Sequence, residues 1–207
     1  MRDYYVEPIF STPLYSSKIE IQNELSVLKS SEFGVSDTYG VKVLDINNYS
    51  LLNMPDFKNL KHQIDEHVER YAREVMCIDP NQKFYMVRSW GVKLPANERA
   101  RTHWHCNSII SGVCYLDTDD NSGSISFKND GGLFGKSFSF DYTNFNYYNS
   151  ETWSVNPQIG DVYLFPSRLS HSIGENKSAK DRYSIAFDYW VRGTIGDKPM
   201  NALNLRP

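Results

Sequence analysis

The chain is poor in the features that would place it outside a reducing cytoplasm. It has three cysteines in 207 residues, Cys77, Cys106 and Cys114, and no CxxC pair, which argues against a disulfide framework. No segment approaches the ~18 consecutive apolar residues of a membrane span, and residues 1–5 do not open a signal peptide. The net charge of −3 lacks the basic excess expected of a nucleic-acid binder. We therefore expect a cytoplasmic protein whose partner is neither a membrane nor a nucleic acid.

Two common catalytic signatures are also missing. The sequence contains no glycine-rich phosphate loop and no GxSxG nucleophile elbow. A thiol nucleophile at Cys106 would stand beside His105, but strand alternation turns neighbouring side chains to opposite faces. The sequence therefore favours neither phosphate-loop chemistry nor nucleophilic hydrolysis.

The apolar and aromatic content is sufficient for one sizeable core. Hydrophobic residues make up 40% of the chain and aromatic residues 14%, and the length suits a single domain. Residues 55–76 carry apolar side chains at steps of three and four, which predicts a helix with one buried stripe: Phe57, Leu60, Ile64, Val68, Tyr71 and Val75. A shorter helix is expected within residues 21–30.

After residue 81 the apolar period changes from helical to alternating. Alternation predicts strands at residues 84–94, 108–116, 124–127, 136–142, 152–155, 161–165, 171–174 and 182–191. Turns rich in Asn, Asp and Gly separate them, and the polar residues 143–152 are expected to form a loop. We predict a mainly β fold, a double-stranded β-helix (jelly roll, cupin-like) with N-terminal helices packed on one side. Residues 1–207 would form one domain, with 1–82 as a helical support region, 83–192 as the jelly-roll core and 193–207 as a C-terminal tail.

Three of the five histidines lie in two short motifs, His103-Trp104-His105 and Ser170-His171-Ser172. Because His103 and His105 are two residues apart, both rings point to the same face at the end of a strand. A third imidazole from a distant strand can close a facial site on a transition metal and leave the opposite positions open. The pattern therefore indicates a metal centre at His103, His105 and His171.

Taken in order, the motifs of the second half resemble the 2-oxoglutarate/Fe(II)-dependent dioxygenases, especially the small oxygenases of bacteria and tailed phages. The resemblance covers residues 89–189 and rests on the HxH pair and on three further blocks: Ser111-Gly112-Val113-Cys114-Tyr115-Leu116, Gly160 to His171, and Arg182-Tyr183-Ser184. It implies an enzyme that uses Fe(II), 2-oxoglutarate and O2 and that can also use ascorbate. The enzyme would hydroxylate a substrate and release succinate and CO2. In a phage protein, its location would be the host cytoplasm.

The same resemblance implies roles for the metal-site residues. His103 and His171 take the first and last positions of the family's metal triad, whereas His105 stands where an Asp or Glu is usual. A neutral third ligand leaves more positive charge on the metal and changes its preference. His105 is therefore either a ligand or a residue that orients the ligands, and Asn107 is a donor behind them.

The resemblance also implies a site for the cosubstrate. Arg182 would bind the distal carboxylate of 2-oxoglutarate with two arms of its planar guanidinium. Ser184 shares a strand face with Arg182 and would add a hydroxyl donor. Tyr115 matches a tyrosine that faces the cosubstrate in prolyl-hydroxylase-type members.

Two other classes of protein stay open at this point. A metal-binding cupin that is not an oxygenase also presents an HxH pair, but it carries a Glu four or five residues later, where this chain has Ile109 and Ile110. A non-enzymatic jelly roll, carbohydrate-binding or virion-associated, would suit the many tyrosines but needs no carboxylate clamp.

Individual residues have alternatives as well. Arg182 could form a surface ion pair with Asp181 or Asp188, and Tyr115 could be a core aromatic. Trp90 and Trp104 either line a substrate pocket or serve in packing. No motif encodes the substrate, whether a small molecule or a peptidyl side chain. The oligomeric state, a homodimer included, is equally open.

Overall fold

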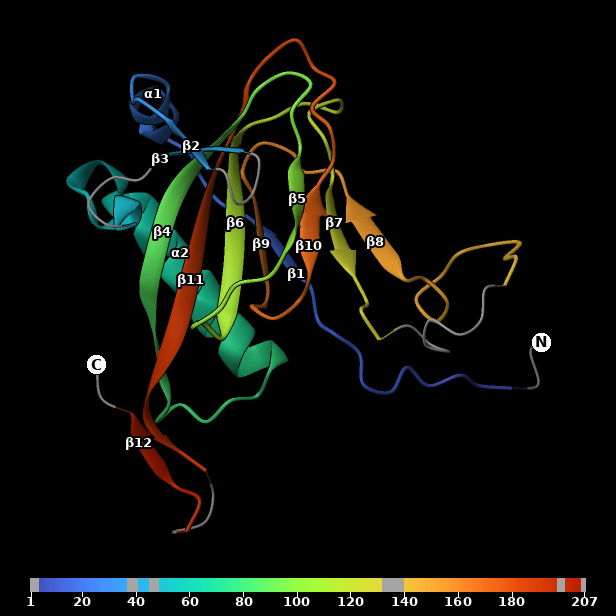
Figure 1. The fold of residues 1–207 in the computed structure, drawn as a ribbon. Helices are drawn as coiled ribbons and strands as arrows, with labels where there is room; N and C mark the ends of the chain where they lie inside the picture. The colour runs from blue at the N-terminus through green and yellow to red at the C-terminus, as the bar shows by residue number, and fades with distance from the viewer. Residues whose placement is uncertain (1–3, 37–40, 45–48, 132–139, 197–199, 206–207) are drawn as a thin grey trace.

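The computed structural model describes residues 4–36, 41–44, 49–131, 140–196 and 200–205. Its centre is a pair of facing sheets built from antiparallel strand pairs (Figure 1). The strands of the larger sheet are β1 (Tyr15–Lys18), β2 (Gly34–Ser36), β3 (Val41–Leu44), β4 (Lys83–Leu94), β6 (Ile110–Asp117), β9 (Asp161–Pro166), β11 (Arg182–Ile195) and β12 (Leu203–Leu205). Those of the smaller sheet are β5 (Ala100–His103), β7 (Ile125–Lys128), β8 (Thr152–Val155) and β10 (His171–Ile173).

The order of the strands is that of a jelly roll. The larger sheet runs β1-β9-β6-β11-β4-β3-β2, with β12 paired to β11, and the smaller sheet runs β5-β10-β7-β8. Strands distant in sequence thus become neighbours, and the two sheets face each other across a shared interior. The predicted mainly β, double-stranded β-helix is confirmed.

Most predicted strands occur within a few residues of their expected bounds. The structure adds strands outside the eight predicted ranges, namely β1, β2, β3, β5 and β12. The strand expected at residues 136–142 falls largely on residues 132–139, which lie outside the described part of the chain, and residues 140–142 form no strand.

The helices cover the face of the larger sheet opposite the smaller sheet (Figure 1). They are α1 (Glu24–Lys29), two short 3-10 turns at Leu51–Asn53 and Pro55–Phe57, α2 (Lys58–Arg70) and a π turn at Tyr71–Val75. The predicted helix at residues 55–76 is therefore three segments in succession. None of the described helices combines the length and hydropathy that crossing a membrane would require.

The apolar stripe of the long helix is buried as predicted, with one exception. The buried members of the stripe are Phe57, Leu60, Ile64, Val68 and Tyr71. Val75 was expected to belong to it but is 45% exposed. The backbone N–H of Met76 bonds to the carbonyl of Tyr71, five residues earlier, and this wider turn rotates the end of the helix off the stripe.

Strand alternation divides the larger sheet into a helix face and an interior face. On β11, Tyr183, Ile185, Phe187 and Tyr189 join the core beneath the helices. The alternate residues of β11, from Arg182 to Asp188, face the smaller sheet. The interior between the sheets is filled by Val113, Tyr115, Ile125, Phe127, Tyr163 and Phe165.

A bulge corrects the simple alternation predicted for residues 84–94. The register between β11 and β4 shifts between Asp188, paired with Arg88, and Tyr189, paired with Met86. Arg88 therefore faces the interior, whereas Met86 packs against the helix core. The bulge lies beside the histidines and sets which side chains reach them.

Candidate metal centre

The three predicted histidines come together at one edge of the smaller sheet. His103 ends β5, His171 begins β10, and the two are register partners. His105 follows two residues after β5, and its ring centroid lies 5.5 Å from that of His103 and 5.2 Å from that of His171. One ring nitrogen from each histidine lies within 4.8 Å of the other two. Within the described residues, this is the one group of three or more metal-ligating side chains at such distances.

The hydrogen bonds of the rings set their tautomers. His103 and His171 each donate Nδ1–H to the backbone carbonyl two residues earlier, at 2.7 and 2.9 Å. His105 donates Nδ1–H to Oδ1 of Asp188 at 2.6 Å. Carbonyl and carboxylate oxygens only accept hydrogen bonds, so each Nδ1 carries a proton, and Nε2 is the nitrogen that keeps a lone pair when the ring is neutral. The donor set therefore fits a metal that accepts three imidazole nitrogens.

Burial keeps the imidazoles in the neutral form that a metal needs. Burial, together with the neighbouring His103, lowers the pKa of His171 to about 3. Burial also lowers the pKa of His103 below its ordinary value. The rings of Phe127 and Phe165 lie 6.2 and 4.9 Å from that of His171 and make this side of the site apolar. At neutral pH, His103 and His171 need lose no proton before they bind a metal.

Asp188 is a functional residue that the sequence analysis missed. Its side chain is 0% exposed and accepts hydrogen bonds from three donors: His105 Nδ1, Ser111 Oγ at 2.6 Å and Arg88 Nη2 at 2.6 Å. Burial by itself raises the pKa of Asp188, but these hydrogen bonds outweigh it and hold the pKa below its ordinary value. The group is therefore a carboxylate. Its even spacing from Arg182 along one strand was the signal available in the sequence.

Arg182 is buried between the sheets, and no anionic partner contacts it in the described part of the chain. It is 1% exposed, and among the described residues its Nε and Nη2 have no hydrogen-bond partner. Its Nη1 donates to the carbonyl of Gly123 at 2.9 Å. The alternative of a surface ion pair is wrong, because Asp181 pairs with Lys93 and Asp188 with Arg88. A buried guanidinium with free donors fits a ligand carboxylate.

The neighbours of Arg182 include both of the other predicted cosubstrate residues. The guanidinium lies 5.3 Å from the ring centroid of Tyr115, whose hydroxyl also has no partner among the described residues. Burial raises the pKa of Tyr115 to about 12, although the nearby Arg182 opposes the shift, so the phenol stays protonated and can donate. Ser184 is buried, is the register partner of Tyr115 and shares the strand face of Arg182.

A glycine shapes the loop that holds Arg182. Gly123 has a φ of 85°, and a Cβ at this position would lie 2.3 Å from the carbonyl oxygen of Gly174. No other residue fits there without moving the backbone. The close approach places the Gly123 carbonyl where Nη1 of Arg182 reaches it.

Asn107 does not take the position expected of it. Its side chain is exposed and donates no hydrogen bond to the histidines within the described part of the chain. Its φ of 58° places it in the left-handed region, which Asn tolerates better than most residues. Asp188 and Ser111 contact His105 instead. Among the described residues, the side chains behind His105 are therefore those of Asp188 and Ser111, and a role for Asn107 stays a prediction.

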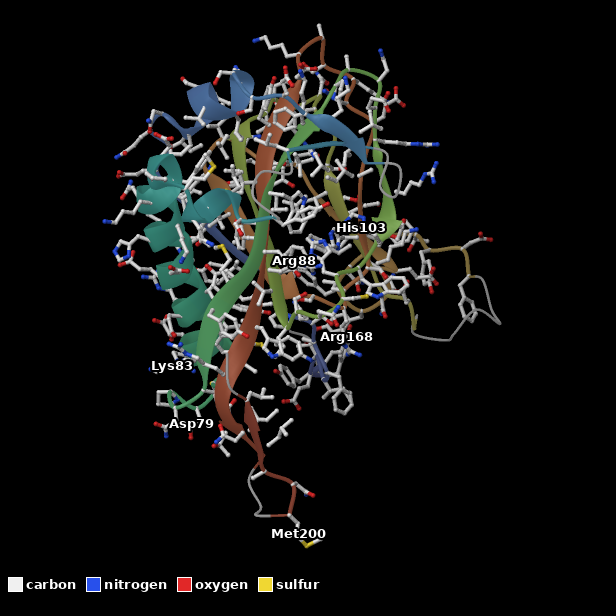
Figure 2. All side chains as sticks on the ribbon, turned by 60° about the vertical axis from the view of Figure 1, so that its left-hand side comes forward. Asp79, Lys83, Arg88, His103, Arg168 and Met200 are labelled. Carbon is white, nitrogen blue, oxygen red and sulfur yellow. The ribbon has the colours of Figure 1, made fainter. Side chains whose placement is uncertain are left out.

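The two tryptophans differ in their surroundings. The ring of Trp90 lies 5.5 Å from that of His105 and contacts Tyr49 on its other side. Trp104 is 57% exposed beside the HxH pair. Cys106 is also exposed, and the described cysteines form no disulfide. Figure 2 shows His103 and Arg88 on the side of the larger sheet away from α2.

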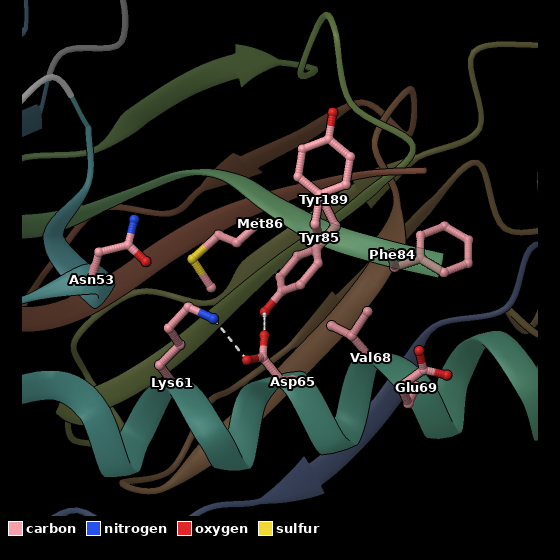
Figure 3. A pocket seen from close by; sticks show the side chains of 9 residues that line it. All are labelled: Asn53, Lys61, Asp65, Val68, Glu69, Phe84, Tyr85, Met86 and Tyr189. Carbon is pink, nitrogen blue, oxygen red and sulfur yellow. Dashed lines mark hydrogen bonds and ion pairs between the residues drawn. The ribbon is translucent and has the colours of Figure 1, made fainter. Parts of the chain in front are cut away.

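A separate pocket of about 350 Å³ lies on the helix side of the larger sheet (Figure 3). Lys61 and Tyr189 both bond to Asp65 at its rim. Tyr189 faces α2, whereas the preceding residue, Asp188, faces the histidines. The pocket is therefore on the opposite face of the sheet from the candidate metal centre.

Comparisons with known proteins point in one direction. Residues 88–188 match the model of a family described as "Putative 2OG-Fe(II) oxygenase". The search of curated proteins gives no match. Among solved structures, the chain is similar to the non-heme alpha ketoglutarate dependent carbocyclase SnoK from nogalamycin biosynthesis, with a TM-score of 0.60 and 11% identity over 86% of this chain and 79% of that one.

Two further structures show the same likeness. A prolyl-4-hydroxylase from Pseudomonas putida gives a TM-score of 0.53 at 12% identity, covering 88% of this chain and 93% of that one. HygX from Streptomyces hygroscopicus, with nickel, 2-oxoglutarate and hygromycin B bound, gives 0.56 at 14% identity, covering 86% and 82%. At these identities the likeness concerns the fold.

The fold and the site together define a class. A jelly roll with three clustered imidazoles and a buried guanidinium that has unpaired donors among the described residues fits a non-heme metal oxygenase with a carboxylate-bearing cosubstrate. The family match narrows this class. Residues 88–188 match the model of the 2OG-Fe(II) oxygenases, a family that uses Fe(II), 2-oxoglutarate and O2.

Proposed function

We propose that His103, His105 and His171 bind Fe(II) through Nε2 and that Arg182 binds the distal carboxylate of 2-oxoglutarate, assisted by Ser184 and Tyr115. The reaction is the hydroxylation of an as yet unidentified substrate, with release of succinate and CO2. The observation that carries the proposal is the unpaired guanidinium of Arg182, buried at 1% exposure on the face of β11 that also reaches the histidines.

The energetics of Arg182 support a ligand role. Burying an ion without its counterion costs several kcal/mol. The hydrogen bond from Arg182 to the carbonyl of Gly123 offsets part of this free-energy cost, but two nitrogens of the guanidinium remain without acceptors among the described residues. A carboxylate accepts two parallel N–H bonds from such a group and cancels its charge. The interior is thus arranged for a dicarboxylic acid before the acid arrives.

The surroundings of each group indicate its role in the reaction. Bound Fe(II) supplies the oxidative chemistry when the cosubstrate and O2 are present. His103 and His171 need lose no proton to bind the metal, and the rings of Phe127 and Phe165 exclude water from the side of His171. Tyr115 and Arg182 orient the cosubstrate through hydrogen bonds.

The substrate approaches from the exposed side of the HxH pair. His171 is buried, whereas His103 and His105 are only partly so, and Trp104 and Cys106 beside them are exposed. Both a small molecule and a peptidyl side chain fit this approach. Among the similar structures, HygX holds hygromycin B and another is a prolyl-4-hydroxylase, which supports both substrate classes.

We also propose a cytoplasmic location and a bacterial or phage source. The three unpaired cysteines, one of them exposed beside the metal centre, support a reducing compartment. We propose further that the protein forms a homodimer, and light scattering would test this.

The test measures succinate formed from 2-oxoglutarate with Fe(II) and ascorbate under air, beside anaerobic titration with Fe(II) and with Ni(II). We expect stoichiometric metal binding, slow succinate release without substrate, and loss of both metal binding and turnover in His171→Ala. The variant Arg182→Ala should keep metal binding but lose turnover at ordinary cosubstrate concentrations. Absence of metal binding, or of any thermal shift with 2-oxoglutarate, would favour a non-enzymatic binding module.

A further inference from the structure

We propose that Asp188 supplies, through His105, the negative charge that a histidine in place of the usual carboxylate ligand removes from the metal. This inference rests on the proposed function, because it takes His105 as a metal ligand. Asp188 does not touch the metal in this account. It is a positioning residue that also tunes the charge of the ligand in front of it.

The three histidines differ in what stands behind them. His103 and His171 donate Nδ1–H to backbone carbonyls. His105 donates to a carboxylate oxygen of Asp188 at 2.6 Å, and hydrogen bonds to an ionised acceptor are shorter and stronger than those to a neutral one. Within the described residues, the carboxylate therefore stands behind the one histidine that occupies the Asp or Glu position of the family. The charge is kept and is moved back by one side chain.

The formal charges show how the Asp188 carboxylate changes the net charge of the metal site. A divalent ion with three neutral imidazoles keeps its full charge of +2, whereas two imidazoles and one carboxylate reduce it to +1. A carboxylate that accepts the Nδ1–H of an imidazole makes its Nε2 more basic and partly anionic. Since Asp188 is 0% exposed, water does not screen this effect. The site then approaches the electrostatics of the usual two-histidine, one-carboxylate triad.

The surroundings of Asp188 keep it ionised and aimed at His105. Arg88 donates Nη2 to the second oxygen, Oδ2, and offsets the cost of burying the charge. Ser111 donates its hydroxyl to the same oxygen that His105 uses. Arg88 also donates to the backbone carbonyl of Cys106 and so ties the residue after His105 to β4.

An ordinary structural ion pair between Arg88 and Asp188 is the competing explanation. The two accounts predict different results when each partner is changed. If the pair is only structural, removing either charge weakens the fold and leaves the metal's properties alone. If Asp188 tunes the metal, removing Asp188 and removing the offsetting charge of Arg88 shift those properties in opposite directions. Arg88 is 38% exposed, so its loss is the milder change.

The experiment compares Asp188→Asn, Arg88→Gln and the control Asp181→Asn, whose carboxylate pairs with Lys93 at 2.8 Å, apart from the histidines. The readouts are the Kd for Ni(II) and Fe(II) under anaerobic conditions and the midpoint potential of the bound iron. We expect Asp188→Asn to bind metal about 10- to 100-fold more weakly and to have a higher potential. Arg88→Gln should lower the potential, and Asp181→Asn should change neither quantity.

Moving the carboxylate from position 188 to position 105 provides an independent check, which also applies if Asp188→Asn folds poorly. The double variant His105→Asp/Asp188→Asn places the carboxylate directly on the metal and removes the one behind. We expect it to regain the metal affinity that Asp188→Asn loses, and His105→Asp alone to bind less tightly than the double variant because two carboxylates then adjoin.

The outcomes separate this inference from the proposed function. Failure of the unaltered protein to bind metal overturns the proposed function itself. Normal metal binding, with Asp188→Asn or Arg88→Gln leaving the potential at its original value, overturns the inference and leaves the proposed function standing.

Discussion

Replacing Arg182 by methionine should separate cosubstrate binding from folding. Methionine has a similar length and no charge, so it fills the same space between the sheets. The change removes the two unpaired donors, Nε and Nη2, that we assign to the distal carboxylate of 2-oxoglutarate. It also removes the bond from Nη1 to the carbonyl of Gly123. The first loss affects the ligand and the second affects the fold.

The magnitudes of the two losses differ. Two charge-assisted hydrogen bonds contribute about 1.5–3 kcal/mol each, so cosubstrate affinity should fall by at least about 100-fold. In the free protein, the unmet Gly123 carbonyl costs about 1–3 kcal/mol, but removing a buried ion that lacks a partner returns about 1–4 kcal/mol. The free energy of unfolding without ligand should therefore stay within about 2 kcal/mol of its original value.

The assay is the stabilisation of the Ni(II)-loaded protein by 2-oxoglutarate. At 100 times the original Kd, the cosubstrate should stabilise the unaltered protein by about 2.7 kcal/mol and Arg182→Met by about 0.4 kcal/mol. Arg192→Met, an exposed arginine on the same strand, is the matched control and should keep the full effect. An Arg182→Met protein that retains cosubstrate affinity, or that unfolds without ligand, refutes the clamp and makes Arg182 a structural residue.

Two further predictions concern the scaffold. Gly112→Ala places a Cβ 2.4 Å from the ring of Phe187 and should lower the free energy of unfolding by about 1–3 kcal/mol in urea titrations, whereas Gly34→Ala, which meets nothing closer than 3.9 Å, should be nearly neutral. Burial raises the pKa of Asp161, but hydrogen bonds led by that of Lys18 bring it below 3.8, so its stabilisation is complete above pH 3.8 and is lost as pH falls through the folded pKa. Asp161→Asn should abolish that part of the acid dependence, and an unchanged pH profile would show that the ion pair between β1 and β9 contributes little.

The parts of the site that sequence could predict depend on local alternation. His103 and His105 share a face because they are two residues apart, and the same holds for Arg182 and Ser184. Neither inference requires knowledge of which strands pair. Convergence with His171 did require it, and there the family resemblance stood in for the missing topology, which the register of β5 and β10 now provides.

The parts that sequence missed depend on pairing between distant strands. Asp188 reaches His105, 83 positions earlier in the chain, and Arg88, 100 positions earlier. The bulge between β11 and β4 decides that Arg88 faces the interior, and no turn residue or composition marks it. The prediction that Val75 is buried was wrong for a related reason, because a π turn depends more on how the helix end packs than on the apolar period of the sequence.

The strand β11 carries both a satisfied and an unsatisfied buried charge, and this contrast identifies the site without reference to any relative. Asp188 has three donors and is complete in the protein alone. Arg182, on the same strand face, has two nitrogens without acceptors among the described residues. Buried polar groups in native proteins are nearly all hydrogen-bonded, so an unpaired guanidinium persists where a ligand completes it. This contrast supports our proposal that the first charge holds a metal ligand in place and that the second binds the cosubstrate.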